Sequence, residues 1–74
     1  MENKVITLQE RFTLKLRAKV SDAEIIEKSM QQTGFKCDIK KCEFLGFRNV
    51  YIYELTIKRA ELVRQLLKNI KVYD

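Results

Sequence analysis

Two tyrosines and a row of cations are the residues of this sequence whose types and spacing favour chemistry. Tyr51 and Tyr53 stand two positions apart in a run rich in Val, Ile and Thr, where a strand would point both rings to one side. In an earlier run, cations occupy odd-numbered positions: Arg11, Lys15, Arg17 and Lys19. Because aromatic rings stack on nucleobases and cations neutralise phosphates, this combination is typical of a surface that binds nucleic acid.

The sequence offers little for catalysis. It has no histidine, the usual acid or base at neutral pH, and no glycine-rich phosphate loop. Cys37 and Cys42 are the only cysteines, and two thiols do not complete a tetrahedral zinc site. Their spacing along a strand points them to opposite faces, which disfavours a disulfide. We therefore expect a protein that is not an enzyme and that uses neither a metal nor another cofactor.

Length and charge limit the class of protein. The chain has 74 residues, enough for one small domain, and 15 Lys and Arg against 10 Asp and Glu give a net charge of +5. A basic protein of this size attracts polyanions, so we expect a nucleic acid or an acidic protein surface as the partner. No apolar run is long enough for a signal peptide or a membrane span, which predicts a cytoplasmic protein without a membrane partner.

Residues 11–20 alternate between apolar and polar side chains, the pattern of a half-buried strand. The apolar side carries Phe12, Leu14, Leu16, Ala18 and Val20. Ser21 follows with Glu24 three residues later, a capping box that predicts the start of a helix at that point. Gly34 supplies the left-handed residue that ends such a helix, and Phe35 is placed to pack back on it.

Two further strands and a second helix follow. Cys37 and Ile39 alternate with charged residues, and residues 47–57 are dense in Val, Ile, Tyr and Thr. Gly46, between these runs, predicts a turn that pairs the two strands antiparallel. Residues 58–69 carry apolar side chains at helical spacing, with Asn69 placed to close the helix, and residues 70–73 have room for a short last strand.

This order of strand, helix, strand, strand, helix and short strand predicts an α+β fold of the ferredoxin-like type. In that β-α-β-β-α-β two-layer sandwich, an antiparallel sheet carries both helices on one face. We expect residues 11–74 to form this single domain. Residues 1–10 are predicted to be an N-terminal arm or an extra edge strand.

The uncovered face of the sheet is expected to carry the cations, and the third strand decides what stands between them. If Val50 and Ile52 are buried, Tyr51 and Tyr53 form a stacking platform edged by charge. If the tyrosines are buried instead, the open face is cationic but not aromatic. A bulge near Glu54 would allow a mixture of the two sides.

Residues 45–52 share Gly46, Phe47 and Val50 with the octamer of RNA-recognition motifs. They carry Asn49 and Ile52 where that octamer has stacking aromatics. Because those aromatics bind the bases, the sequence predicts no membership of that family.

We therefore expect a small basic binding module without catalysis, which binds RNA or single-stranded DNA through the open sheet face. The residues predicted to bind are Arg11, Lys15, Arg17, Lys19, Lys36, Lys40, Arg48, Tyr51 and Tyr53. The alternative is a protein interaction module or inhibitor, of the kind that phages and mobile elements encode. It would mask a partner's surface, or form a homodimer through a sheet edge that a short last strand leaves partly unpaired.

Overall fold

The alternating run at the start of the chain forms a strand, as predicted. In the computed structural model, which describes residues 10–73, this strand is β1 (Phe12–Lys19). Its side chains Leu16 and Ala18 are buried, while Lys15 and Lys19 are exposed. Residues 1–9 of the predicted N-terminal arm or edge strand lie outside the described residues.

Three strands form one antiparallel sheet. β3 (Phe47–Leu55) lies between β1 and β2 (Cys37–Lys41) and pairs antiparallel with both. Val50 of β3 therefore has Leu16 on one side and Ile39 on the other. Gly46, with φ at 82°, lies in the turn between β2 and β3, so the predicted antiparallel pairing is confirmed.

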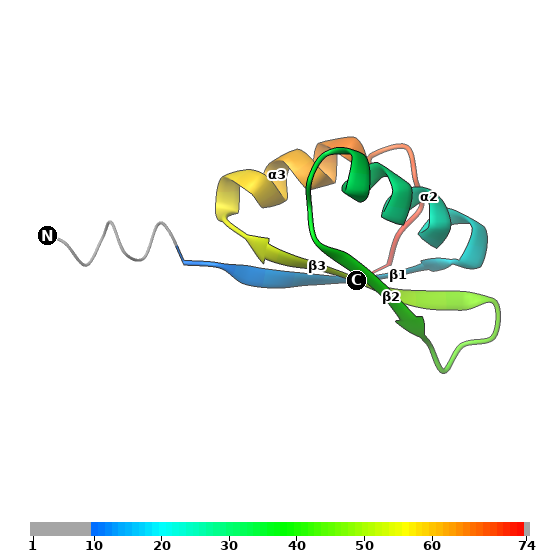
Figure 1. Ribbon diagram of the computed structural model, residues 1–74. Helices are drawn as coiled ribbons and strands as arrows, with labels where there is room; N and C mark the ends of the chain where they lie inside the picture. The colour runs from blue at the N-terminus through cyan, green and yellow to red at the C-terminus, as the bar shows by residue number, and fades with distance from the viewer. Residues whose placement is uncertain (1–9, 74) are drawn as a thin grey trace, which may run out of the picture.

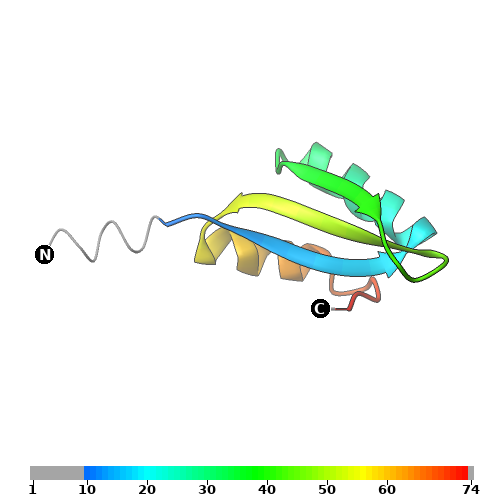
Figure 2. The same cartoon turned by 90° about the horizontal axis from the view of Figure 1, so that it is seen from below.

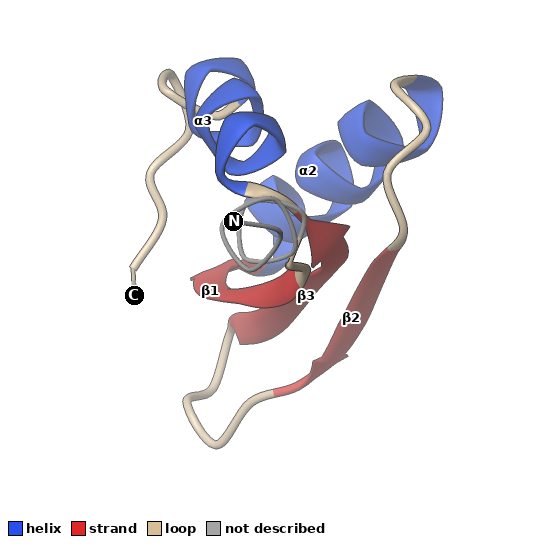
Figure 3. Ribbon diagram, turned by 90° about the vertical axis from the view of Figure 1, so that its left-hand side faces the viewer, coloured by secondary structure: helices blue, strands red, loops and turns tan. Residues whose placement is uncertain are grey.

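Helices α2 (Val20–Gln32) and α3 (Ile57–Leu66) cover one face of this sheet (Figures 1 and 3). The space between the two layers is filled by buried apolar side chains: Leu16, Ala18, Ala23, Ile26, Met30, Phe35, Val50, Ile52, Leu55, Ala60, Val63 and Leu67. Within residues 10–73 no helix is both long enough and apolar enough to cross a membrane. The protein is thus a small α+β domain with two layers and one core.

The start of α2 differs from the prediction. The helix begins at Val20, and its N-cap, Lys19, makes no side-chain capping hydrogen bond. The backbone N–H of Val20 instead donates to the carbonyl of Gly46 at 3.0 Å. A tertiary contact with the β2–β3 turn thus takes one of the free amides of the first turn, and Ser21 lies inside the helix rather than at its cap.

Helix α3 and the segment after it are shorter than predicted. Thr56 is the N-cap of α3, and its hydroxyl accepts a hydrogen bond from the N–H of Arg59 at 3.3 Å. The helix ends at Leu66, not at Asn69, and turns follow it. The predicted strand over residues 70–73 is reduced to one bridge, between Tyr73 and Arg17 of β1.

A bulge in β3 determines which side chains face the helices. Leu14 pairs with Ile52, but Phe12 pairs with Leu55, so β3 has one extra residue between these two pairs. Glu54 lies in this stretch with φ at 58°, in the left-handed region. Ile52 and Leu55 consequently both face the core, although three positions separate them.

Candidate nucleic-acid interface

No segment within residues 10–73 covers the sheet face opposite the helices (Figure 2). The buried residues of each strand face the helices, so the residues of opposite parity point to this side. We define the open face by these residues: Lys15, Arg17 and Lys19 of β1, Asp38 and Lys40 of β2, and Phe47, Asn49, Tyr51 and Tyr53 of β3. It carries four cations and one carboxylate.

Tyr51 and Tyr53 form the centre of the open face. Their rings are nearly parallel, with centroids 6.4 Å apart and an interplanar angle of 13°. The ammonium groups of Lys15 and Lys40 lie 5.9 and 5.5 Å from the centroid of Tyr51. The sequence left two arrangements undecided, and the structure has the one in which both tyrosines lie beside the cations. We call the pair of Tyr51 and Tyr53 the tyrosine platform. The bulge at Glu54 allows it while still burying Leu55.

Asp38 is the carboxylate of the open face. It lies opposite Tyr51 in the β2–β3 register, and it also helps to raise the pKa of Tyr53. Partial burial, with this neighbouring carboxylate, raises the pKa of the Tyr53 phenol above its ordinary value. The raised pKa extends toward higher pH the range over which this phenol keeps its proton and can donate a hydrogen bond.

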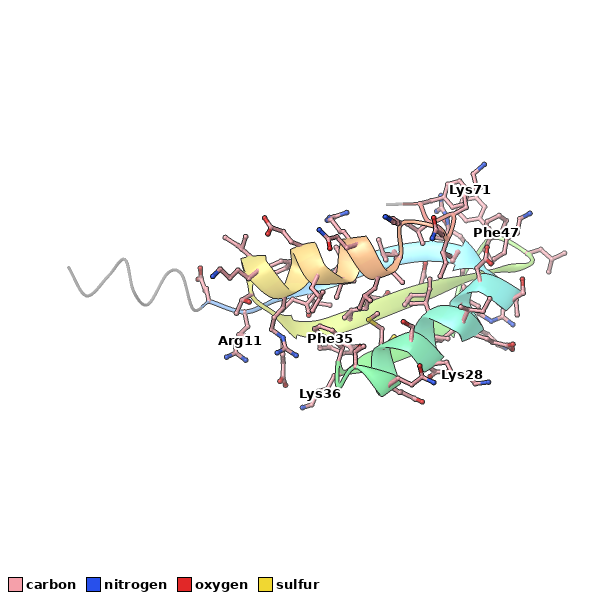
Figure 4. All side chains as sticks on the ribbon, turned by 90° about the horizontal axis from the view of Figure 1, so that it is seen from above. Arg11, Lys28, Phe35, Lys36, Phe47 and Lys71 are labelled. Atoms are coloured by element: carbon pink, nitrogen blue, oxygen red, sulfur yellow. The ribbon has the colours of Figure 1, made fainter. Side chains whose placement is uncertain are left out.

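Two of the predicted cations lie at the far end of the sheet. The ammonium of Lys36 donates to the carboxylate of Glu54 at 2.9 Å, which raises the pKa of Lys36 and lowers that of Glu54. Arg11 and Lys36 line the same shallow hollow, next to Tyr53. Figure 4 shows Arg11 and Lys36 at one end of the domain and Phe47 at the other. A phosphate bound near Lys36 would have to compete with Glu54.

Arg48 does not lie on the open face. It has the parity of Val50 and Ile52, so its side chain leaves β3 on the helix side, and its Nη1 donates to the carbonyl of Phe47 at 2.9 Å. The sequence did not settle this, because both sides of the third strand contain apolar residues. Among the described residues, the only ion pair is the one between Lys36 and Glu54. The cations of the open face are Lys15, Arg17, Lys19 and Lys40.

Arg17 lies beside aromatic residues that are not among the predicted binding residues. Its guanidinium lies 4.4 Å from the ring centroid of Phe44, in the β2–β3 turn, and 5.9 Å from that of Tyr73. The ring of Phe47 meets Tyr73 edge to face, with centroids 5.8 Å apart. The sequence feature that could have indicated this cluster is the apolar pair Phe44–Leu45 beside Gly46, because a solvated turn needs no apolar residues.

A second hollow includes the Arg17–Phe44 pair in its lining. It measures about 480 Å³, and Lys15, Lys41 and Asn49 line it together with that pair and Glu43. The charges around it are three cations and one carboxylate. This is a place where an anionic group could bind beside the tyrosine platform.

The described residues hold no group of three or more His, Cys, Asp or Glu side chains that could bind a metal ion. Cys37 and Cys42 are both free thiols. Comparisons of the chain with protein families, with curated proteins and with solved structures find no match. The geometry of the open face is therefore the basis for a proposal about function.

Proposed function

We propose that this protein is a non-catalytic module that binds RNA or single-stranded DNA on the open face. The observation that carries the proposal is Tyr51, whose ring has an exposed cation on either side and a parallel ring next to it. A base stacked on such a ring gains about 1–3 kcal/mol, and the flanking cations lie where its phosphates pass.

The charge of the open face supports this proposal. Within residues 10–73, none of its four cations forms an ion pair. Lys15, Arg17 and Lys19 stand in one row along β1 and repel one another, and a polyanion along that row would relieve the repulsion. Asp38 reduces the positive field near Tyr53, so the phosphates are expected to run along β1 and toward the β2–β3 turn.

The salt dependence of binding tests the proposal. We expect a labelled single-stranded oligonucleotide to bind with an affinity that falls steeply as salt rises. If about four or five phosphates are engaged, the slope of log K against log salt lies near −3 to −4. Fluorescence anisotropy between about 50 and 200 mM salt measures this slope. An affinity that ignores salt would exclude this mode of binding.

Two lysine variants locate the interface. Lys15→Gln removes a cation of the open face. It is expected to make the slope of log K against log salt less negative by about 0.7–0.9, the share of one phosphate. Lys28→Gln is the matched control, because Lys28 is an exposed residue of α2, on the helix side of the domain (Figure 4). Equal effects of the two substitutions would mean that net charge, and not the open face, drives binding.

We also propose that the fold is ferredoxin-like, with its fourth strand shortened to the bridge at Tyr73. The order β1-β3-β2 supports this, since that fold also places the third strand between the first two. Tyr73 supports it too, because it pairs antiparallel with the free side of β1, where the fourth strand of that fold lies.

A protein-binding module is the second candidate, and the outer edge of β1 favours it. Arg17 exchanges two backbone hydrogen bonds with Tyr73 across this edge, at 2.7 and 2.8 Å. No other segment within residues 10–73 pairs with this edge, so the outward backbone groups of Lys15 are open to an extended partner strand. A hollow of about 300 Å³ alongside is lined by Leu14, Leu16, Val63 and Leu67, among others, and would accept apolar side chains of that strand.

A further inference from the structure

A small aromatic hollow lies at the turn end of the sheet, beyond the tyrosine platform. It measures about 170 Å³ and is lined by Arg17, Phe44, Phe47 and Tyr73. These four residues come from β1, the β2–β3 turn, β3 and the C-terminal segment, so the hollow exists only in the folded chain. Its lining is three aromatic rings and one guanidinium, and we call it the aromatic hollow.

The walls of the aromatic hollow are held in place by contacts within the protein. The N–H of Arg17 donates to the carbonyl of Tyr73 at 2.7 Å, and the N–H of Tyr73 donates back at 2.8 Å. The edge of one ring meets the face of the other in the Phe47–Tyr73 pair. The hollow is therefore largely formed before any ligand arrives, which lowers the entropy cost of binding.

The chemistry of the lining restricts the ligand. Arg17 lies in the wall and the ammonium of Lys71 lies 5.8 Å from the ring of Tyr73, so a cationic ligand would be repelled. A ligand with a flat aromatic ring fits this lining, since such rings stack on aromatic side chains and on guanidinium planes alike. Phe44 is 47% exposed, so a ring can reach the stack from solvent.

We propose that the aromatic hollow accepts one unstacked base of a single-stranded nucleic acid. This inference rests on the proposed function and adds a subsite to it. The cationic hollow of about 480 Å³ shares Arg17 and Phe44 with the aromatic hollow, and its cations Lys15 and Lys41 receive the adjoining phosphate. Glu43 also lines the cationic hollow. Its carboxylate is exposed to solvent, so it weakens this phosphate site without closing it.

A consequence is selectivity for single strands. A base in a duplex is paired and stacked on its neighbours, so it enters the hollow only after it has been unpaired and unstacked. Phosphates of a duplex can still meet the cations of the open face. The protein is therefore expected to bind a single strand more tightly than a duplex of the same sequence.

Phe44→Ala tests this inference, with Leu45→Ala as the matched control. Phe44 lines the hollow, whereas its neighbour Leu45 is 99% exposed and does not line it. We expect Phe44→Ala to weaken single-strand binding roughly 5- to 150-fold, the worth of one stacked base, and to leave duplex binding and the salt slope unchanged. Leu45→Ala is expected to bind single strands and duplexes as tightly as the wild type does.

A second variant keeps the test independent of the turn's conformation. Arg17→Lys retains the charge but loses the planar group that stacks. It is expected to lower the preference for single strands while the salt slope stays the same. If single strands bind with the expected slope but Phe44→Ala behaves like Leu45→Ala, the aromatic hollow is not a base site and the proposed function survives. If the wild type binds no oligonucleotide, both proposals are wrong.

Discussion

The thiol of Cys37 faces the core from β2, and its burial has a chemical consequence. Cys37 packs against the buried cluster, and this burial, with the nearby carboxylates Glu27 and Asp38, raises its pKa from 9.0 to about 11. Very little of it is thiolate at neutral pH, so Cys37 is a poor nucleophile. Cys37 thus acts as a small, partly buried apolar group at the edge of the core.

The raised pKa of Cys37 predicts a pH dependence. In the unfolded chain the thiol ionises near its ordinary pKa, so the folded state binds more protons at alkaline pH. The stability that this provides is complete below about pH 9 and is lost as the pH rises toward 11. Labelling of a Cys42→Ser variant by iodoacetamide is expected to accelerate up to about pH 11 in the folded protein, and to level off near pH 9 in urea. Levelling near pH 9 in the folded protein would contradict the assignment.

The end of α2 is an element that the sequence predicts residue by residue. Gly34 has φ at 85°, its N–H donates to the carbonyl of Gln31, and the N–H of Phe35 donates to that of Met30 at 2.9 Å. These are the two hydrogen bonds of a Schellman motif, and buried Phe35 packs back on the helix as expected.

Gly34→Ala is predicted to destabilise the domain by about 1 kcal/mol. A Cβ at this position would meet no atom within 4 Å, so the cost arises from the left-handed backbone alone. Urea unfolding followed by circular dichroism measures the change. Gln32→Ala, an exposed helical neighbour, is the control and is expected to change the unfolding free energy by less than about 0.5 kcal/mol. Equal stability of the two variants would argue against this helix end.

Elements set by local patterns could be predicted from the sequence, and elements set by tertiary contacts could not. The alternation in β1 and the glycine turn before β3 each follow from a few adjacent residues. The start of α2 does not, because the N–H of Val20 finds its acceptor in Gly46, distant in the sequence. A cap formed by Ser21 is the local solution, and the fold uses another.

The candidate site shows the same division. The cations of β1 and the two tyrosines were found, because each set follows the period of a strand. Which side of β3 is buried was left undecided, because apolar residues stand on both sides of that strand. The bulge near Glu54, one of the alternatives that the sequence offered, changes the parity within the strand. The aromatic hollow was missed because Phe44, Phe47 and Tyr73 meet only when the turn and the C-terminal segment pack around Arg17.

The two candidate functions would use different surfaces of the domain. Nucleic-acid binding would use the open face, with its tyrosine platform and with cations that form no ion pair within residues 10–73, whereas protein binding or a homodimer would use the outer edge of β1. The two surfaces share Lys15 and Arg17 but not Tyr51, which lies on the central strand. A substitution at Tyr51 therefore separates the two functions.

Purification of the protein is predicted to show which surface is used. Gel filtration is expected to give a monomer with bound nucleic acid, which a high-salt wash removes. The ratio of absorbance at 260 and 280 nm reports this sensitively, because the chain has three tyrosines and no tryptophan. Tyr51→Ala is expected to lower that ratio before the wash, relative to Tyr51→Phe, which loses the same chromophore but keeps a ring that stacks. A salt-resistant dimer free of nucleic acid, whose elution neither substitution changes, would instead assign function to the edge of β1.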